Sequence, residues 1–120
     1  MNRKRHNYKN LKIWSLGLEI ACDISDILES FPKHERFDLS SQMSRAATSI
    51  PSNISEGSSR TDKAFSTFID YALGSSFELG TQLHIARHKN YIDDKKLIEL
   101  ETKIQEWQKM TMGFQNKLKN

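Results

Sequence analysis

The sequence of 120 residues lacks several features that would place it in a specialised class of protein. Its single cysteine, Cys22, excludes an internal disulfide framework and any zinc site built from several cysteines. Two prolines and five glycines are too few for collagen or for a disordered Pro/Gly tract. No apolar run approaches the roughly 20 residues of a membrane-spanning helix, and no secretory signal is recognisable. We therefore expect a soluble protein of the cytoplasm.

Groups that carry chemistry are also sparse. No complete catalytic constellation is present, so we expect a protein that is not an enzyme and that holds no cofactor or metal. His84 and His88 have the i, i+4 spacing of zinc ligands, but the glutamate of an HExxH motif and a third ligand are missing, which favours two surface histidines. Cys22 has no base beside it in the sequence and is expected to be a small buried residue. An enzyme that uses Glu78 or the two histidines stays an open alternative.

Helical periodicity is what the sequence does contain. Apolar residues recur at steps of three or four along four segments, and no segment shows the alternation of a strand. These segments cover residues 8–30, 38–57, 61–89 and 94–118. The four helical segments predict an all-α fold. Because short links between long helices favour antiparallel neighbours, we expect an up-down-up-down antiparallel four-helix bundle over residues 10–120, preceded by a basic tail at residues 1–9.

Several residues are predicted to set the helix ends. Asp38, Asp93 and either Ser59 or Thr61 are candidate N-caps, because their side-chain oxygens can accept hydrogen bonds from unpaired backbone N–H groups. Pro32 is expected to end the first helix, since the residue before a proline is disfavoured in the helical conformation.

The second segment contains Pro51, which is expected to kink the helix because it removes one backbone hydrogen bond. The small polar residues around it, among them Asn53, are suited to satisfy the freed backbone. Gly57 is the predicted helix stop, with Glu56 just before it. A contact surface for RNA or protein is the functional alternative for this stretch, and the structural interpretation is favoured.

Apolar and small residues also make predictions about packing. Gly74 and Gly80 lie inside the third segment, where a glycine costs about 1 kcal/mol relative to alanine, so they predict a close neighbouring helix. In the first segment the residues of the predicted core face are Leu11, Trp14, Leu18, Ala21, Ile24, Leu28 and Phe31. The additional row of Ile13, Ile20 and Ile27 exceeds one face and is interpreted as an oligomer contact.

Charge is unevenly distributed along the chain. Residues 1–12 contain five basic residues and residues 109–120 contain three, with no acidic residue in either, whereas residues 13–108 have a net charge of −5. The predicted topology brings both basic ends and the link between the second and third helices to one end of the bundle, where they would form a patch for polyanions. A solvated tail with lysines at a helix C-terminus is the alternative. The candidate nucleic-acid-binding residues are Arg3, Lys4, Arg5, Lys9, Lys12, Arg60, Lys63, Lys117 and Lys119.

Three polar residues lie close to apolar faces of the second and third segments. In an antiparallel hairpin centred near residue 59, Gln42 faces the region of Glu78, and Arg45 lies about one turn away. We expect Gln42, Arg45 and Glu78 to form a polar network that fixes register or an oligomer contact, because buried polar groups need partners.

Two runs of the sequence carry a family resemblance. They are ERFDLSSQ at residues 35–42 followed by RAATSIPSNISEGSSR at 45–60, and ALGSSFE at 72–78. With Leu11 and Trp14 upstream and Tyr91-Ile92 downstream, they resemble the signatures of the 23S rRNA intervening-sequence protein family, once labelled ribosomal proteins of the S23 type. Ser55 stands where that family usually has alanine.

The resemblance implies an antiparallel four-helix bundle that assembles as a homopentamer in the form of a short barrel. The family is also similar to the accessory protein of diversity-generating retroelements, which assists a reverse transcriptase and contacts nucleic acid. No enzymatic activity is implied. We therefore expect a homo-oligomeric scaffold whose basic end binds RNA or DNA in a salt-sensitive and sequence-tolerant manner. A protein–protein adaptor with no nucleic-acid role is the alternative.

Overall fold

Four long helices make up most of the chain. The computed structural model describes residues 5–118 and the backbone of Lys119. Over these residues no strand is formed, and two short 3₁₀ turns accompany the helices. The elements are η1 (Tyr8–Asn10), α1 (Lys12–Leu28), η2 (Lys33–Glu35), α2 (Leu39–Ser58), α3 (Asp62–His88) and α4 (Asp94–Lys119). The predicted all-α fold and its four helical segments are confirmed.

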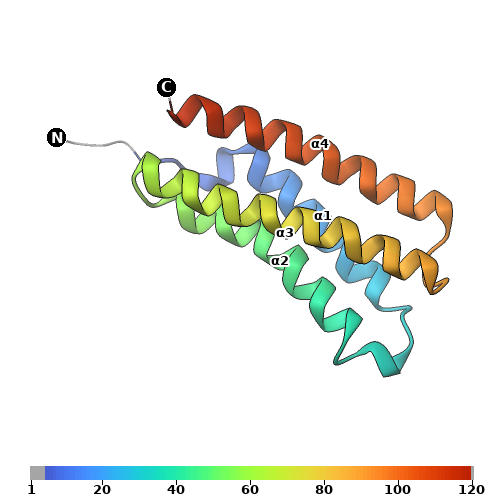
Figure 1. Ribbon diagram of the computed structural model, residues 1–120. Coiled ribbons are helices and arrows are strands. Elements are labelled where there is room, and N and C mark those ends of the chain that lie inside the picture. Colours follow the sequence, from blue (N-terminus) through green and yellow to red (C-terminus); the bar gives the residue numbers. More distant parts are fainter. Residues whose placement is uncertain (1–4, 120) are drawn as a thin grey trace.

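Successive helices pack side by side and run in alternate directions along a molecule of 54 × 24 × 19 Å, consistent with an up-down bundle (Figure 1). At one end, the guanidinium of Arg5 donates to the carbonyl oxygen of Ser59 in the α2–α3 turn. The ring of His6 lies 5.9 Å from that of Phe114 near the end of α4. We call this end, which gathers residues 5–12, the α2–α3 turn and the last turns of α4, the basic pole.

The opposite end contains the links between α1 and α2 and between α3 and α4, and we call it the link pole (Figure 1). Here the phenol of Tyr91 donates to Glu35 Oε2 at 2.7 Å, and Lys89 Nζ lies 3.0 Å from the same oxygen. Glu35 is 2% exposed. These hydrogen bonds from Tyr91 and Lys89 lower the pKa of the Glu35 carboxyl below its usual 4.5. Lys89 and Tyr91 follow Glu35 by 54 and 56 residues in the sequence, so the cluster joins two distant links of the chain.

Side chains of α1, α2 and α4 meet in the core around Gly17. The Trp107 side chain is fully buried, and its indole Nε1 donates to the carbonyl oxygen of Ile13 at 2.7 Å. A β-carbon at Gly17 would lie 3.2 Å from Ile50 Cγ2 and 3.3 Å from Trp107 Nε1. Gly17 therefore provides the space that lets α1 approach both of its neighbours.

The predicted core face of α1 is confirmed at Ile24 and Phe31, which are buried, and is wrong in the first half of the helix. The buried positions of this helix are Ile13, Gly17, Ile20 and Ile24. Ile13 and Ile20, interpreted as part of an oligomer contact, therefore belong to the core, whereas Ile27 of the same row is half-buried. Leu18, assigned to the core face, is 40% exposed. The two rows have the same helical spacing, and the close approach at Gly17 selects the isoleucine row.

Helix α2 continues through Pro51, which is buried. The side chains of Ser49 and Asn53 donate to the carbonyl oxygens of Ala46 and Ser49. Neither donates to the carbonyl oxygen of Ala47, which the proline leaves without its usual donor, so the predicted satisfaction of the freed backbone group is not found among the described residues. Asp38 occupies the N-cap position as predicted, but its carboxylate accepts from Gln42 Nε2 and makes no cap hydrogen bond.

Gly57 does not end α2, which corrects the predicted helix stop. It lies inside the helix without a positive φ, and the cap is Ser59. A β-carbon at Gly57 would lie 2.7 Å from both Phe65 Cδ1 and Phe68 Cβ. The glycine is required for the close approach of α3 to the last turn of α2.

The caps of the last two helices are confirmed. Thr61 accepts from the Ala64 amide at 3.2 Å, and Asp93 accepts from the Lys96 amide at 2.8 Å. The close neighbour predicted at Gly74 and Gly80 is not found among the described residues, because a β-carbon at either would meet nothing within 4 Å.

Candidate functional site

The basic pole holds the cationic residues predicted to bind nucleic acid, as far as the structure describes them. Lys9 lies in η1, Lys12 begins α1, Arg60 and Lys63 flank the start of α3, and Lys117 lies in the last turns of α4. Arg3 and Lys4 and the side chain of Lys119 lie outside the described residues. The predicted meeting of both chain ends with the α2–α3 turn is confirmed, because three parts of the sequence carry their charges to one end of the bundle.

The N-terminal segment is held against this pole by aromatic packing. The His6 ring contacts Phe65 of α3 and Phe114 of α4 edge-on, with centroids 5.3 and 5.9 Å apart, and those two phenyl rings are 5.5 Å apart. His6 Nε2 also lies 3.2 Å from Asp62 Oδ1. This packing fixes the position of Arg5, next in sequence, beside the α2–α3 turn.

The cationic side chains of the basic pole differ in their ion pairs and cation–π contacts. The Arg60 guanidinium lies 3.6 Å from Glu56 and 5.2 Å from the centre of the Phe68 ring. The ammonium groups of Lys9, Lys12, Lys63 and Lys117 are exposed and take part in no ion pair with another described residue. Four lysines are therefore available to an anionic partner.

The predicted polar network of Gln42, Arg45 and Glu78 is not formed in the part of the chain that the structure describes. All three are exposed, Gln42 donates to Asp38 at 3.1 Å, and no hydrogen bond or ion pair joins any two of them in the described part of the chain. The interpretation failed because each residue lies on the outer side of its helix. The packed helices are bridged instead by Ser49 to Ser75 at 2.5 Å, Gln108 to Ser76 at 2.9 Å and Gln115 to Asp70 at 2.7 Å.

The two histidines of α3 have different surroundings. His84 lies 2.6 Å from Glu101 of α4, and His88 is exposed. Within residues 5–119 no three His, Cys, Asp or Glu side chains converge on a possible ion position. The hollow beside His84 also contains Ser76, but that hydroxyl donates to the Leu73 carbonyl at 2.6 Å and accepts from Gln108, so it is already engaged.

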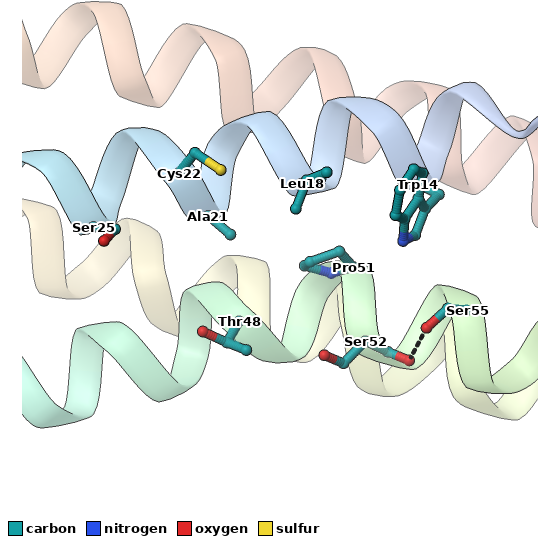
Figure 2. A pocket seen from close by; sticks show the side chains of 9 residues that line it. All are labelled: Trp14, Leu18, Ala21, Cys22, Ser25, Thr48, Pro51, Ser52 and Ser55. Atoms are coloured by element: carbon teal, nitrogen blue, oxygen red, sulfur yellow. Dashed lines mark hydrogen bonds between the residues drawn. The ribbon is translucent and has the colours of Figure 1, made fainter. Parts of the chain in front are cut away.

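A shallow groove of about 300 Å³ runs between α1 and α2 (Figure 2). Trp14, Leu18 and Ala21 line it from α1, and Pro51 faces them from α2. Cys22 also lines the groove and is exposed, which corrects the expectation that it is buried. The sequence signal for this groove is the row that begins at Trp14, which was assigned to the core.

Comparison with protein families identifies the family of this chain. A family model described as 23S rRNA-intervening sequence protein matches residues 9–113. The chain belongs to this family. A crystal structure of a protein of unknown function from the S23 ribosomal protein family, from Bacteroides thetaiotaomicron, is similar to it with a TM-score of 0.79 and 22% sequence identity. The similarity covers 86% of this chain and 97% of that one, and at this identity it concerns the fold. A comparison with curated proteins finds no match.

In this member of the 23S rRNA-intervening sequence family, the signature run SIPSNISEG lies within α2 and carries packing residues. Ile50 and Ile54 are fully buried, Pro51 lies opposite Gly17 of α1, and Gly57 contacts the phenylalanines of α3. None of the helices between residues 5 and 119 combines the length and apolar character needed to cross a lipid bilayer. The favoured structural interpretation of this run is therefore supported by its contacts.

Proposed function

We propose that this family member is a cytoplasmic, non-enzymatic scaffold whose basic pole binds nucleic acid through phosphate contacts. The observation that carries the proposal is the convergence of residues 5–12, the α2–α3 turn and the end of α4, which leaves four lysines without an ion-pair partner among the described residues. Binding that depends on lysine and phosphate is tolerant of sequence and weakens with salt. Glu56 at the same pole lies 3.6 Å from the Arg60 guanidinium, which reduces the repulsion of phosphate by this carboxylate.

A homo-oligomer, and specifically a pentamer, is part of the proposal. The groove between α1 and α2 leaves apolar surface of Trp14 and Leu18 accessible, and Tyr71 and Phe77 of α3 are more than half exposed, at 57% and 56%. Association of copies would cover such surface. Each copy would add a basic pole, and linked weak sites bind a long polyanion more tightly than one site alone.

Duplex DNA provides the direct test. If the four unpaired lysines neutralise four phosphates, log K falls by about 0.9 per phosphate for each tenfold rise in salt, so binding weakens roughly 100-fold between about 50 and about 200 mM salt. We expect Lys12→Gln combined with Lys117→Gln to make this dependence shallower by about two phosphates. Fluorescence anisotropy of a labelled duplex measures both quantities.

The matched control is Lys33→Gln combined with Lys95→Gln, which removes the same charge from exposed residues at the link pole. The control should retain the wild-type salt dependence. Absence of duplex binding at low salt, or an equal effect of the two double variants, would refute a nucleic-acid role for the basic pole.

A protein–protein adaptor is the second candidate, and the observation that favours it is the apolar α1–α2 groove (Figure 2). Binding of a protein partner in this groove would persist at high salt, because burial of apolar surface is little screened. It would also persist after deletion of residues 1–9 and would be lost on Leu18→Arg. Nucleic-acid binding should respond to these changes in the opposite way.

A further inference from the structure

A second hollow, of about 540 Å³, lies at the link pole between the end of α1 and the first turns of α2. It shares Ser25 with the groove of Figure 2, so the two depressions follow the same pair of helices. It is an open depression of the surface and not an enclosed cavity. Its lining is rich in hydrogen-bond donors, which distinguishes it from the apolar groove.

Two arginines line this hollow, and they differ from the other arginines that the structure describes. Arg5, Arg60 and Arg87 each engage a carbonyl or carboxylate oxygen. Arg36 and Arg45 engage no such oxygen of a described residue. Guanidinium groups bind phosphate and carboxylate with two parallel hydrogen bonds, so two guanidiniums in one hollow that engage no protein oxygen indicate an oxyanion as the ligand.

The serine hydroxyls give the same indication independently. Most serines of the chain use their hydroxyl in a hydrogen bond within the protein, commonly to the carbonyl three residues earlier. Five serine hydroxyls within residues 5–119 make no such bond, and four of the five line this hollow. These four are Ser25, Ser40, Ser41 and Ser44. Free donors are thus concentrated in the same place as the free guanidiniums.

An aromatic ring completes the hollow. Phe37 is 89% exposed, which makes it the most exposed of the large apolar side chains in the described part of the chain. The Arg36 guanidinium lies 5.4 Å from the centre of its ring, and both residues line the hollow. An exposed aromatic face beside cations is the arrangement on which proteins stack the bases of single-stranded nucleic acid.

We propose that this hollow binds one nucleotide unit of a single strand, with the phosphate on Arg36 and Arg45 and the base on the Phe37 ring. The serine hydroxyls supply further donors to the phosphate. Glu29 also lines the hollow, so the formal charge of the hollow is +1. The Glu29 carboxylate can accept a hydrogen bond from a ring N–H of a base, such as N3–H of uracil. This site lies at the opposite end of the bundle from the basic pole, and it would bind a base as well as a phosphate. It is therefore distinct from the phosphate-binding surface proposed above.

Titration of the ¹⁵N-labelled full chain with tetra-uridylate tests the proposal by NMR. We expect saturable amide shifts at residues 36–45, centred on Phe37 and Ser41. Phe37→Ala should weaken this binding about 5-fold or more, because stacking of a base on an aromatic ring contributes about 1–3 kcal/mol. Arg45→Ala should weaken it further in low salt.

The chain offers a matched control for each variant. Ile98 of α4 is 62% exposed, and Ile98→Ala removes a comparable exposed apolar side chain away from the hollow. Lys95→Ala removes one positive charge from an exposed position at the same pole. Both controls should bind tetra-uridylate as the wild type does.

The outcomes separate this site from the basic pole. Shifts confined to Lys9, Lys12, Lys63 and Lys117 overturn the hollow and leave the proposed function standing, whereas shifts at residues 36–45 with no duplex binding do the reverse. If inorganic phosphate or a phosphoserine peptide gives the same shifts and Phe37→Ala has no effect, the hollow is a simple anion or phosphopeptide site, and the proposal of base stacking is wrong.

Discussion

Replacement of Gly57 by alanine tests how closely α2 and α3 approach each other. An alanine β-carbon would lie 2.7 Å from Phe65 Cδ1 and from Phe68 Cβ. Both distances are about 0.7 Å shorter than the 3.4 Å at which ordinary contact begins. Phe68 Cβ is attached directly to the backbone and Phe65 is fully buried, so neither can move aside without moving α3.

Two opposing effects set the magnitude. Overpacking of a well-filled core costs about 1–3 kcal/mol. Alanine is favoured over glycine inside a helix by about 0.8–1 kcal/mol. Because two rigid contacts are violated together, we place the overpacking cost at the upper end of its range and expect Gly57→Ala to lower the free energy of unfolding by about 1–2 kcal/mol.

Urea denaturation followed by circular dichroism measures this change, and a second glycine provides the control. Gly113 also lies inside a helix, and a β-carbon there would meet nothing within 4 Å. Gly113→Ala should therefore raise the free energy of unfolding by about 1 kcal/mol through helix propensity alone. The same chemical change is expected to have opposite signs at the two positions.

The interpretation fails if Gly57→Ala is as stable as the wild type or more stable. That result would mean that the last turn of α2 is free to separate from α3. Destabilisation by Gly113→Ala would be informative in another way, since it would require a neighbour at that surface which a single chain does not supply.

Two further predictions concern the link pole and the α1–α2 groove. Tyr91→Phe should lower the free energy of unfolding at neutral pH, because it removes a hydrogen bond that favours the charged form of Glu35 and lowers the pKa of that carboxyl in the folded state. The hydrogen bond weakens when the carboxyl takes up its proton, so the difference in stability from the wild type should shrink as the pH falls below about 4.5. Urea denaturation at several pH values checks this, and a difference that stays constant with pH would contradict it. In dilute solution, Cys22 of the native protein should react with a maleimide at the rate of a surface thiol. The reaction should be slower at concentrations where copies associate over the groove that Cys22 lines, and mass spectrometry of the labelled chain measures both rates.

The sequence predicted the helices well because their periodicity is local. The predicted segments end within a few residues of the observed ones, and Thr61 and Asp93 cap as expected. The convergence of the two chain ends also followed from sequence, since it requires only helix lengths and short links. These features depend on neighbours along the chain.

The errors arose where a distant part of the chain decides the outcome. Gly57 near a helix end is typical of a stop, but its role is set by Phe65 and Phe68 across the α2–α3 interface. The two apolar rows of α1 are indistinguishable by spacing, and Gly17 decides between them only because Trp107 lies opposite.

The hydrogen-bonded cluster around Glu35 was not predicted at all. The partners of Glu35 are Lys89 and Tyr91, which lie 54 and 56 residues further along the sequence, so no local pattern contains them. The hollow beside Phe37 was missed for a related reason. Its unusual property is that its donors lack acceptors, which becomes visible only when the partners of all other arginines and serines are known.

The length of the molecule changes how its net charge should be understood. Electrostatic interactions in physiological salt decay over about 8 Å. The bundle is 54 Å long, so its two ends are separated by several of these decay lengths. A polyanion near one end is therefore insensitive to the carboxylates around the middle, and the formal value of +3 describes neither end. Each extremity meets its surroundings as an electrically independent surface.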